Sequence, residues 1–472
     1  MKIFFAASEA YPFAATGGLA DVIGSLPTAL AGRGHEVSLV MPFYGCIEVP
    51  GSLEWLDGDF RTMAGENFGV AGTTHPVGGY PVYFVASDEY FTGRGIYGPD
   101  PASAYDDNAA RFAFFARAVA AMSGFTGFDF DIMHCHDWQT GLVPVYLRNN
   151  RKPASVFTVH NLHFKGVFPR DDYAATFLPW DLYTMEALEF HGDFSFIKGG
   201  LVFSRRVTTV SPTYAREMET VEFGEGLEGV IGRISGKLTG ILNGIDYVVW
   251  DPSSDPEIAA RFSAGSISGR KKCGKALREA AGLDVEGPVL GVVSRLTFQK
   301  GIDLLFPLVD HVVDEGAGLV VLGTGDPDME ERLTALAEKF PGKVSVMLRF
   351  DESMARRIFA GCDILVMPSR FEPCGLAQMI GMRYGSVPLV RRTGGLADTV
   401  TDVSDGGWGF VFETPDVDSL SVALDRAINA FRNRKRWPRL VNMCMTVDNS
   451  WENRVPAYEE VYRRAIAERS GN

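Results

Sequence analysis

Residues 2–42 read KIFFAASEAYPFAATGGLADVIGSLPTALAGRGHEVSLVMP, and this stretch decides the fold class. It opens with a short apolar run over 2–8, which predicts a buried strand. A glycine-bearing loop follows, then a helical pattern that closes at Gly32 and Gly34, and then a second apolar strand over 36–42. A strand, a helix and a strand in this order predict a parallel sheet with a right-handed crossover.

The same unit recurs along the chain. Further strands are predicted over 131–136, 154–160, 207–212, 289–296, 318–325, 343–350 and 363–369. A helix is predicted from Trp138 and another over 301–316. Residues 241–258, dense in Pro, Asp and Ser, separate the two series and predict a hinge. We therefore expect an α/β chain of two Rossmann-like, doubly wound lobes, with the carboxyl ends of both sheets opening into a shared cleft.

Composition narrows the possible partners. The formal net charge is −14, which argues against a nucleic-acid partner because phosphates would be repelled overall. No stretch approaches the roughly 20 apolar residues that span a bilayer, and Glu9 interrupts the N-terminal apolar run too early for a signal peptide. Six scattered cysteines without a CxxC pair fit a reducing cytoplasm.

The hexapeptide TGGLAD occurs twice, at 16–21 and at 393–398. In each copy the glycines follow an apolar strand and precede a helix, so the backbone and the first helical amides could approach an anionic or hydroxyl-rich ligand. The alternative is a tight turn with no ligand. A matched copy in each lobe favours a shared ligand.

Charged residues follow two strands of the second series. Arg295 and Lys300 surround a turn at a strand's carboxyl end, where they could bind a diphosphate; a solvated loop is the alternative. Glu372 precedes Pro373 after the apolar strand 363–369, and the amides after it open a helix that could accept a phosphate. A carboxylate that merely caps this helix is the competing role.

Polar residues also end two strands of the first series. HCHDW, residues 134–138, lacks the further histidine of a binuclear metal site, so Asp137 is better read as a ligand for sugar hydroxyls. His160 and Asn161 end the neighbouring strand. The DFD at 129–131 resembles a metal site only superficially, since its aromatic residues favour packing. No serine nucleophile elbow and no phosphate-binding GxxxxGK[ST] loop is present.

Taken together, these segments resemble the bacterial glycogen synthase and plant starch synthase family. The matching stretches are TGGLADVIGSLP (16–27), HCHDWQTGL (134–142), TVHNLHFKGVFP (158–169), TVSPTYAREM (209–218), ILNGID (241–246), VSRLTFQKG (293–301), LGTGDP (322–327) and PSRFEPCGLAQMIGMRYGSVPLVRRTGGLADTV (368–400). They span nearly the whole chain in one order and are highly specific as a set.

The resemblance implies the GT-B arrangement of two lobes, an acceptor-side lobe over 1–242 and a nucleotide-sugar-binding lobe over 243–454, with a C-terminal helix over 455–472 that returns to the first. It implies a retaining, metal-independent hexosyltransferase without a cofactor. Glucose would pass from ADP-glucose, or UDP-glucose, to the 4-OH at the non-reducing end of an α-1,4-glucan.

The family's site residues carry over to matching positions. The implied catalytic residues are Glu372, His160 and Asp137. The implied donor-binding residues are Gly17, Gly18, Arg295, Lys300, Asn243, Gly375, Leu376 and Ala377. Asp21 and Asn161 would bind the sugar or the acceptor. No metal ligand is expected.

Two features leave alternatives open. Ala15 stands where the family has a lysine that reaches the donor phosphates, so a weakly active glucan-binding or regulatory paralogue is one alternative. A related transferase that makes a small glucoside is another.

The second acid of the E-x7-E pattern of related retaining enzymes is absent, since Ile380 stands eight residues after Glu372. This favours a same-face, ion-pair route over a double displacement.

Overall fold

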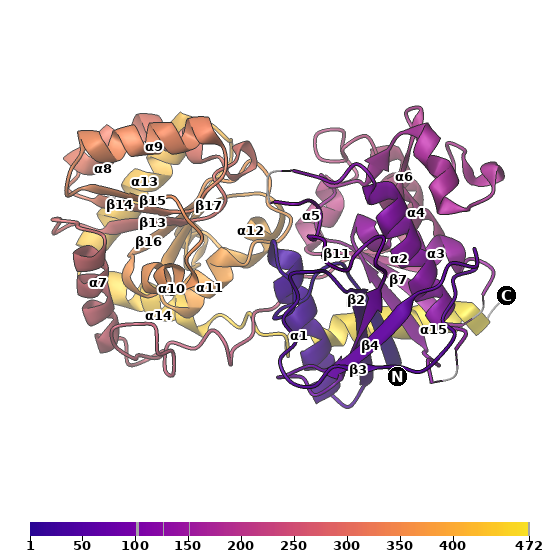
Figure 1. Ribbon diagram of the computed structural model, residues 1–472. Helices are drawn as coiled ribbons and strands as arrows, with labels where there is room; N and C mark the ends of the chain where they lie inside the picture. The colour runs from indigo at the N-terminus through magenta and orange to yellow at the C-terminus, as the bar shows by residue number, and fades with distance from the viewer. Residues whose placement is uncertain (101–102, 126, 151, 471–472) are drawn as a thin grey trace. The chain divides into compact units, whose positions relative to one another are not determined.

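The computed structural model of the 472-residue chain describes residues 1–100, 103–125, 127–150 and 152–470. They form two compact units, Met1–Gly244 with Trp451–Asn472, and Ile245–Ser450 (Figure 1). The expectation that placed Asn243 at the start of the second lobe is wrong. Its neighbour Gly244 packs so closely on Trp451 that an added Cβ would lie 2.6 Å from the Trp451 backbone nitrogen. The chain leaves the first unit after Gly244 and returns to it at Trp451, so both residues of this contact belong to the first unit.

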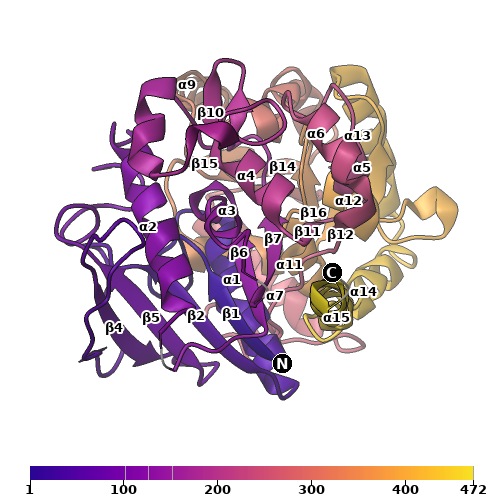
Figure 2. The ribbon, with the colours of Figure 1, turned by 90° about the vertical axis from the view of Figure 1, so that its right-hand side faces the viewer.

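The large sheet of the first unit has the order β12-β11-β7-β6-β1-β2-β5-β4-β3. Strands β12 to β5 run parallel, and β4 and β3 add antiparallel at one edge (Figure 2). The strands are β1 (Lys2–Ala6), β2 (Glu36–Pro42), β3 (Glu54–Trp55), β4 (Gly69–Thr74), β5 (Pro81–Ala86), β6 (Ile132–His136), β7 (Ala154–Val159), β11 (Arg206–Thr209) and β12 (Leu238–Gly240). Every residue of β6 and β7 is buried, as expected of central strands covered on both faces.

Helices surround this sheet. They are α1 (Gly18–Gly32), α2 (Asn108–Met122), α3 (Val143–Tyr146), α4 (Phe196–Phe203), α5 (Pro212–Glu217), α6 (Glu228–Ile234) and α15 (Val455–Ser470), with a small antiparallel sheet of β8 (Val167–Phe168), β10 (Asp193–Ser195) and β9 (Glu189–Phe190) beside them. The C-terminal helix α15 packs on β6, β7 and β11. Its Glu459 accepts hydrogen bonds from Arg33 at 2.8 and 3.0 Å, which fixes the N-terminal part of α15 beside the C-terminal end of α1.

The sheet of the second unit has the order β15-β14-β13-β16-β17-β18, all parallel. Its strands are β13 (Val289–Val293), β14 (Gly318–Leu322), β15 (Val344–Met347), β16 (Ile364–Met367), β17 (Val387–Arg391) and β18 (Phe410–Phe412). The helices are α7 (Ser268–Ala280), α8 (Val309–Asp314), α9 (Pro327–Lys339), α10 (Glu352–Gly361), α11 (Ala377–Arg383), α12 (Gly394–Thr399), α13 (Val417–Arg432) and α14 (Trp437–Thr446). Helices α8, α9 and α13 cover one face of the sheet, and α10, α11 and α14 cover the other (Figure 1).

Several local expectations fail for identifiable reasons. The helix predicted over 301–316 is broken into short 3₁₀ turns followed by α8, because Pro307 cannot continue a helix that starts before it. The helix predicted from Trp138 is a 3₁₀ turn followed by the short α3, and the two are separated at Gly141 and Leu142. In the two large sheets, the strands that were not predicted are β3, β4, β5, β12, β17 and β18.

Most of the predicted hinge is fixed to the second unit. The Arg356 guanidinium donates to the Val249 carbonyl at 3.0 Å and to Asp255 Oδ2 at 3.1 Å, and it lies 4.1 Å over the Trp250 ring. Asp255 is itself buried. The segment from Ile245 onward is therefore part of the second unit. The chain passes from the first unit to the second between Gly244 and Ile245.

Across the residues that the structure describes, no helix combines the length and the apolar character needed to cross a bilayer.

Candidate functional site

Each sheet reverses its strand order at one point. In the first unit the reversal lies between β1 and β6, and in the second it lies between β13 and β16. Ligands of open α/β sheets bind outside the carboxyl ends of the strands at such points. The residues singled out in the sequence follow these strands, so each unit carries its own group of candidate site residues.

In the second unit Lys300 and Glu372 form an ion pair. Lys300 Nζ lies 2.6 Å from Glu372 Oε2, and the Ser369 hydroxyl donates to the same oxygen at 3.0 Å. The side chains of Lys300 and Glu372 are only 17% and 6% exposed. The sequence singled out both residues but gave no sign that they touch. Their contact follows from the pairing of β13 with β16, which brings the two strand ends together.

Arg370 fixes the turns that carry this pair. Its guanidinium binds both carboxylate oxygens of Asp303 at 2.7 Å and lies 3.9 Å over the Phe298 ring. The backbone N–H of Arg370 also donates to the Gln299 carbonyl at 2.8 Å. These contacts join the 3₁₀ turn Phe298–Lys300 to the turn before Glu372. The geometry of the ion pair is therefore set before any ligand binds.

Arg295 behaves differently from Lys300. It follows β13 and is exposed, and its guanidinium forms no hydrogen bond or ion pair with the residues that the structure describes. A guanidinium that is unpaired at a strand's carboxyl end is available to bind an anion bidentately. Arg392, beside the second TGGLAD copy, is instead paired with Glu413 at 2.7 Å.

The second TGGLAD copy supports the Glu372 turn. A Cβ added at Gly394, whose φ is +42°, would lie 2.0 Å from the Glu372 carbonyl oxygen, and one added at Gly395 would lie 2.1 Å from the Cys374 carbonyl oxygen. The Gly395 N–H also donates to the Glu372 carbonyl at 3.0 Å. The glycines of this copy thus make room for a neighbouring turn of the protein.

The first copy differs in this respect. A Cβ added at Gly17 would meet no atom of the described residues within 4 Å. Residues 15–18 are all exposed, and Gly18 is the first residue of α1. The two identical hexapeptides therefore have different surroundings, and ligand binding by either copy stays a prediction.

This contrast gives a prediction about stability. Gly394→Ala is expected to destabilise the second unit by about 1–3 kcal/mol, the usual cost of overpacking, with added strain from the positive φ. Gly17→Ala, the matched control, is expected to cost less than about 1 kcal/mol, since only a glycine N-cap is changed. Thermal unfolding followed by circular dichroism compares the two. Equal melting temperatures for both variants would contradict the assigned packing.

Helix capping is not the role of Glu372. Its carboxylate oxygen Oε2 is engaged by Lys300 and Ser369, whereas α11 begins at Ala377 with Leu376 as its N-cap. The preceding Gly375 has a φ of +73°, a conformation that favours glycine. The backbone amides of Leu376 and Ala377 open α11, where the first N–H groups of a helix have no intrahelical partner.

In the first unit Asp137 follows β6 in an unusual conformation. Its φ is +56°, which is uncommon for a residue with a side chain, and its Oδ1 accepts the backbone N–H of His160 at 2.7 Å. Burial raises the pKa of Asp137 to about 7, the N–H groups of His160 and Asn161 lower it in part, and the charge of Glu9 adds to the rise. Strained backbone and a perturbed carboxyl at a strand end are typical of functional sites.

The raised pKa predicts a pH-dependent effect on stability. The Asp137 carboxyl ionises near pH 4 in the unfolded chain but only near pH 7 in the folded chain. The folded state therefore loses stability as pH rises from about 4 to about 7. Asp137→Asn removes this penalty and should raise the melting temperature more at about pH 8 than at about pH 5. Asp57→Asn, at an exposed carboxylate, is the control. A pH-independent difference would contradict the assignment.

His160 is held by its neighbours on β6. Its Nε2 lies 2.9 Å from His136 Nδ1. His134, two residues before His136, is bonded instead to Tyr462 Oη of α15 at 2.9 Å and to Thr158 Oγ1 at 2.7 Å. Burial lowers the pKa of His160 to about 3 and places that of His136 well below its usual range. All these histidines are therefore neutral near pH 7.

Glu9 is a site residue that the sequence analysis missed. It follows β1, is 3% exposed, and accepts hydrogen bonds from the backbone N–H and the hydroxyl of Thr16 and from Tyr97 Oη. Its place directly after a buried strand is the signal that would have found it. Glu9 anchors the loop that leads into Gly17.

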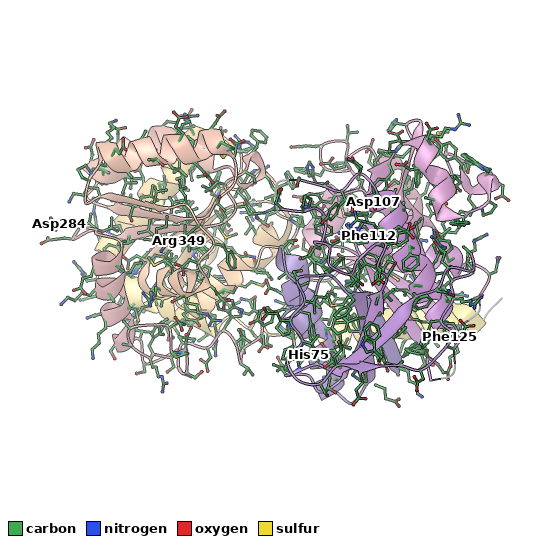
Figure 3. All side chains as sticks on the ribbon, viewed as in Figure 1. His75, Asp107, Phe112, Phe125, Asp284 and Arg349 are labelled. Atoms are coloured by element: carbon green, nitrogen blue, oxygen red, sulfur yellow. The ribbon has the colours of Figure 1, made fainter. Side chains whose placement is uncertain are left out.

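The loop that carries Tyr97 is itself fixed by α2. The buried Arg111 guanidinium donates to the carbonyls of Tyr90, Gly95 and Ile96 at 2.8 to 3.1 Å. Phe112, also on α2 and labelled in Figure 3, packs against Trp138 with ring centroids 4.9 Å apart. Helix α2 thus supports both Tyr97 and the residue next to Asp137.

The remaining predicted residues are placed as follows. Asp21 lies exposed in the first turn of α1, and Asn161 Oδ1 accepts the backbone N–H of His163 at 3.1 Å. Asn243 is 4% exposed, and its Oδ1 has no hydrogen-bond partner within the described residues. The aromatic residues around 129–131 are buried, and Phe130 stacks on Phe4 at 4.2 Å, as the packing interpretation expects. Over the described parts of the chain, no three His, Cys, Asp or Glu side chains gather as metal ligands would.

Comparison with known proteins decides the family. Residues 2–233 match the family described as starch synthase catalytic domain, and residues 275–439 match glycosyl transferases group 1. A glycogen synthase of Anaeromyxobacter dehalogenans is 44% identical over 98% of this chain and 99% of its own length. The chain belongs to the glycogen synthase family. Glycogen synthase 2 of Geobacter sulfurreducens is 41% identical over the whole of both chains.

Solved structures agree with membership of the glycogen synthase family. The catalytic domain of starch synthase IV from Arabidopsis thaliana, solved with ADP and acarbose, superposes with a TM-score of 0.90 at 33% identity over 99% of both chains. Sucrose-phosphate synthase from Thermosynechococcus elongatus, at 16% identity and a TM-score of 0.62, shares the fold. The fold is GT-B, and this glycogen synthase homologue is a retaining glycosyltransferase that uses a nucleotide sugar as donor and a glucan as acceptor.

Proposed function

We propose that this chain transfers glucose from ADP-glucose to the 4-OH at the non-reducing end of an α-1,4-glucan. The observation that carries the proposal is the ordered Lys300–Glu372 pair beside the unpaired Arg295, at the strand-order reversal of the second unit. The related starch synthase IV structure holds ADP, which supports an adenine nucleotide as the donor.

The cations serve the leaving group. As the bond to glucose breaks, negative charge accumulates on the departing diphosphate, and fixed positive groups stabilise that charge most in the transition state. Arg295 supplies a planar fork and Lys300 a point charge. The amides of Gly375, Leu376 and Ala377 add donors at the start of α11. Because these side chains supply the positive charge, we propose that the reaction requires no metal, and activity should survive EDTA.

The engaged carboxylate favours a same-face route. A double displacement needs a free carboxylate that attacks the anomeric carbon. Glu372 Oε2 already accepts from Lys300 and Ser369, which lowers its nucleophilicity. We therefore assign Glu372 to stabilising positive charge on the glucosyl unit. Asp137, His160 and Asn243 position the glucosyl group, and Asp21 and Asn161 bind the sugar or the acceptor.

One assay tests the donor. Purified protein with glycogen is offered ADP-glucose or UDP-glucose, and release of the nucleoside diphosphate is measured together with chain length. We expect ADP release with chain elongation and a preference for ADP-glucose. Faster turnover with UDP-glucose would overturn the donor assignment. Binding of glycogen without turnover of either donor would favour the weakly active paralogue that Ala15 raises as an alternative.

A further inference from the structure

His136 and His160 share a hydrogen bond, and the residues around them determine which ring nitrogen of each carries the proton. His136 ends β6 and His160 follows β7, the neighbouring parallel strand. Their Nδ1 and Nε2 atoms are 2.9 Å apart, so one ring must donate to the other. Both rings are neutral near pH 7, and each therefore carries a single N–H.

The hydrogen bond between the two rings can run in either direction, and the two directions differ in whether His136 Nε2 carries a proton. This atom is buried and has no hydrogen-bond partner among the described residues. If His160 donated, His136 would carry its proton on Nε2 as a buried N–H without an acceptor. If His136 donates from Nδ1, Nε2 is only an unpaired acceptor. Buried N–H groups without a partner are the rarer case in native proteins.

The neighbouring aromatic ring does not relieve the first arrangement. The Phe5 ring lies nearly parallel to that of His136, with an interplanar angle of 16° and centroids 5.6 Å apart. An N–H in the plane of the imidazole therefore does not point at the Phe5 face. The His134 ring, with its centroid 4.1 Å from that of His136, has both nitrogens engaged by Tyr462 and Thr158. Donation from His136 Nδ1 to His160 Nε2 is therefore the arrangement that the surroundings favour.

We propose that His136 is a positioning residue that fixes the proton of His160 on Nδ1, so that His160 acts as a hydrogen-bond donor to a sugar hydroxyl. With Nε2 occupied by His136, the one polar ring atom left for a ligand is Nδ1, which bonds to no residue in the described part of the chain. His160 then has no free lone pair and does not act as a general base. The backbone N–H of His160, held by Asp137, fixes the other end of the residue.

The tautomer is directly measurable in the wild-type protein. Long-range ¹H–¹⁵N correlation spectra of the full chain with ¹⁵N-labelled histidine distinguish Nδ1–H from Nε2–H imidazoles. The His160 signals are assigned by their loss in His160→Gln. We expect the Nδ1–H form for His160 at neutral pH without substrate. An Nε2–H form would overturn the proposal, whatever the donor or acceptor of the enzyme.

The role in turnover rests on the proposed function and is tested by variants. His136→Phe keeps the bulk and removes the donor, and we expect kcat to fall by about 10- to 100-fold, the usual effect of losing an orienting partner behind a functional histidine. The dissociation constant for ADP should stay within about twofold, because ADP is assigned to the second unit. His136→Asn, which keeps an N–H near the Nδ1 position, should restore most of the activity and the Nδ1–H spectrum.

His134→Phe is the matched control. His134 is equally buried and lies on the same strand, but it bonds to Tyr462 and Thr158. We expect this variant to lose stability while the His160 tautomer stays Nδ1–H. If His136→Phe folds and keeps wild-type kcat, or if His136→Asn and His136→Phe are equally impaired, the positioning role is wrong. A wild-type Nδ1–H signal together with no turnover of any donor would leave the tautomer intact and reject only the proposed function.

Discussion

Glu372→Gln is expected to lower kcat for glucan synthesis by about 10²- to 10³-fold. The amide preserves the size of the side chain but removes the charge that pairs with Lys300 in a buried setting. Removing one fixed group that stabilises transition-state charge raises the activation free energy by about 2.7–4 kcal/mol, and each 1.36 kcal/mol changes a rate about tenfold. Initial rates of ADP release at saturating donor and glycogen measure the effect.

Two comparisons make this result specific. Glu413→Gln disrupts an ion pair of similar length, with Arg392, but on the exposed surface, and it should change kcat by less than about twofold. In a double-mutant cycle, adding Lys300→Met to Glu372→Gln should cost much less than Lys300→Met alone, since the two groups act together. Equal turnover of wild type and Glu372→Gln with every donor would remove the basis for an enzymatic role.

Ala15→Lys is expected to raise kcat/KM for the donor by about 10- to 100-fold. A hydrogen bond to a charged group contributes about 1.5–3 kcal/mol, which corresponds to this range. The position is exposed, so a longer side chain can be accommodated without repacking. The adjacent Thr16 is fixed to Glu9 through its backbone N–H and its hydroxyl, so the new side chain would start from an ordered point.

The control for this gain is Ala15→Met, which adds comparable length without charge. It should leave kcat/KM near the wild-type value, while high salt should reduce the gain of the lysine variant. An unchanged or lower kcat/KM in Ala15→Lys would mean that the donor phosphates do not come near this loop.

The strands of both sheets were the most predictable part of the fold. Short continuous apolar runs such as 289–296 and 363–369 are typical of the buried strands of a parallel sheet. These two runs correspond to β13 and β16. Strands β3 and β4 were missed because exposed and half-exposed strands carry a weaker pattern. Strands β17 and β18 were also missed, although every residue of both is buried. The prediction of one helix over 301–316 was wrong because it followed the apolar spacing and ignored Pro307.

The candidate site was predictable residue by residue but not contact by contact. Lys300, Glu372, Asp137 and His160 all follow buried strands, which is visible in the sequence. Which of them touch depends on strand order, and no local pattern encodes that β13 neighbours β16. For a related reason the sequence did not reveal that the glycines of the second TGGLAD copy make room for the carbonyls of Glu372 and Cys374.

The return of the C-terminal helix has a consequence for biosynthesis. Helix α15 packs on β6, β7 and β11, and its Tyr462 bonds to His134 in the interior of the first unit. A ribosome adds these residues only after the whole of Ile245–Ser450 has been synthesised. The first unit is thus completed only after the second unit has been translated. A nascent chain interrupted before Trp451 would carry all of the second unit and a first unit with an uncovered sheet.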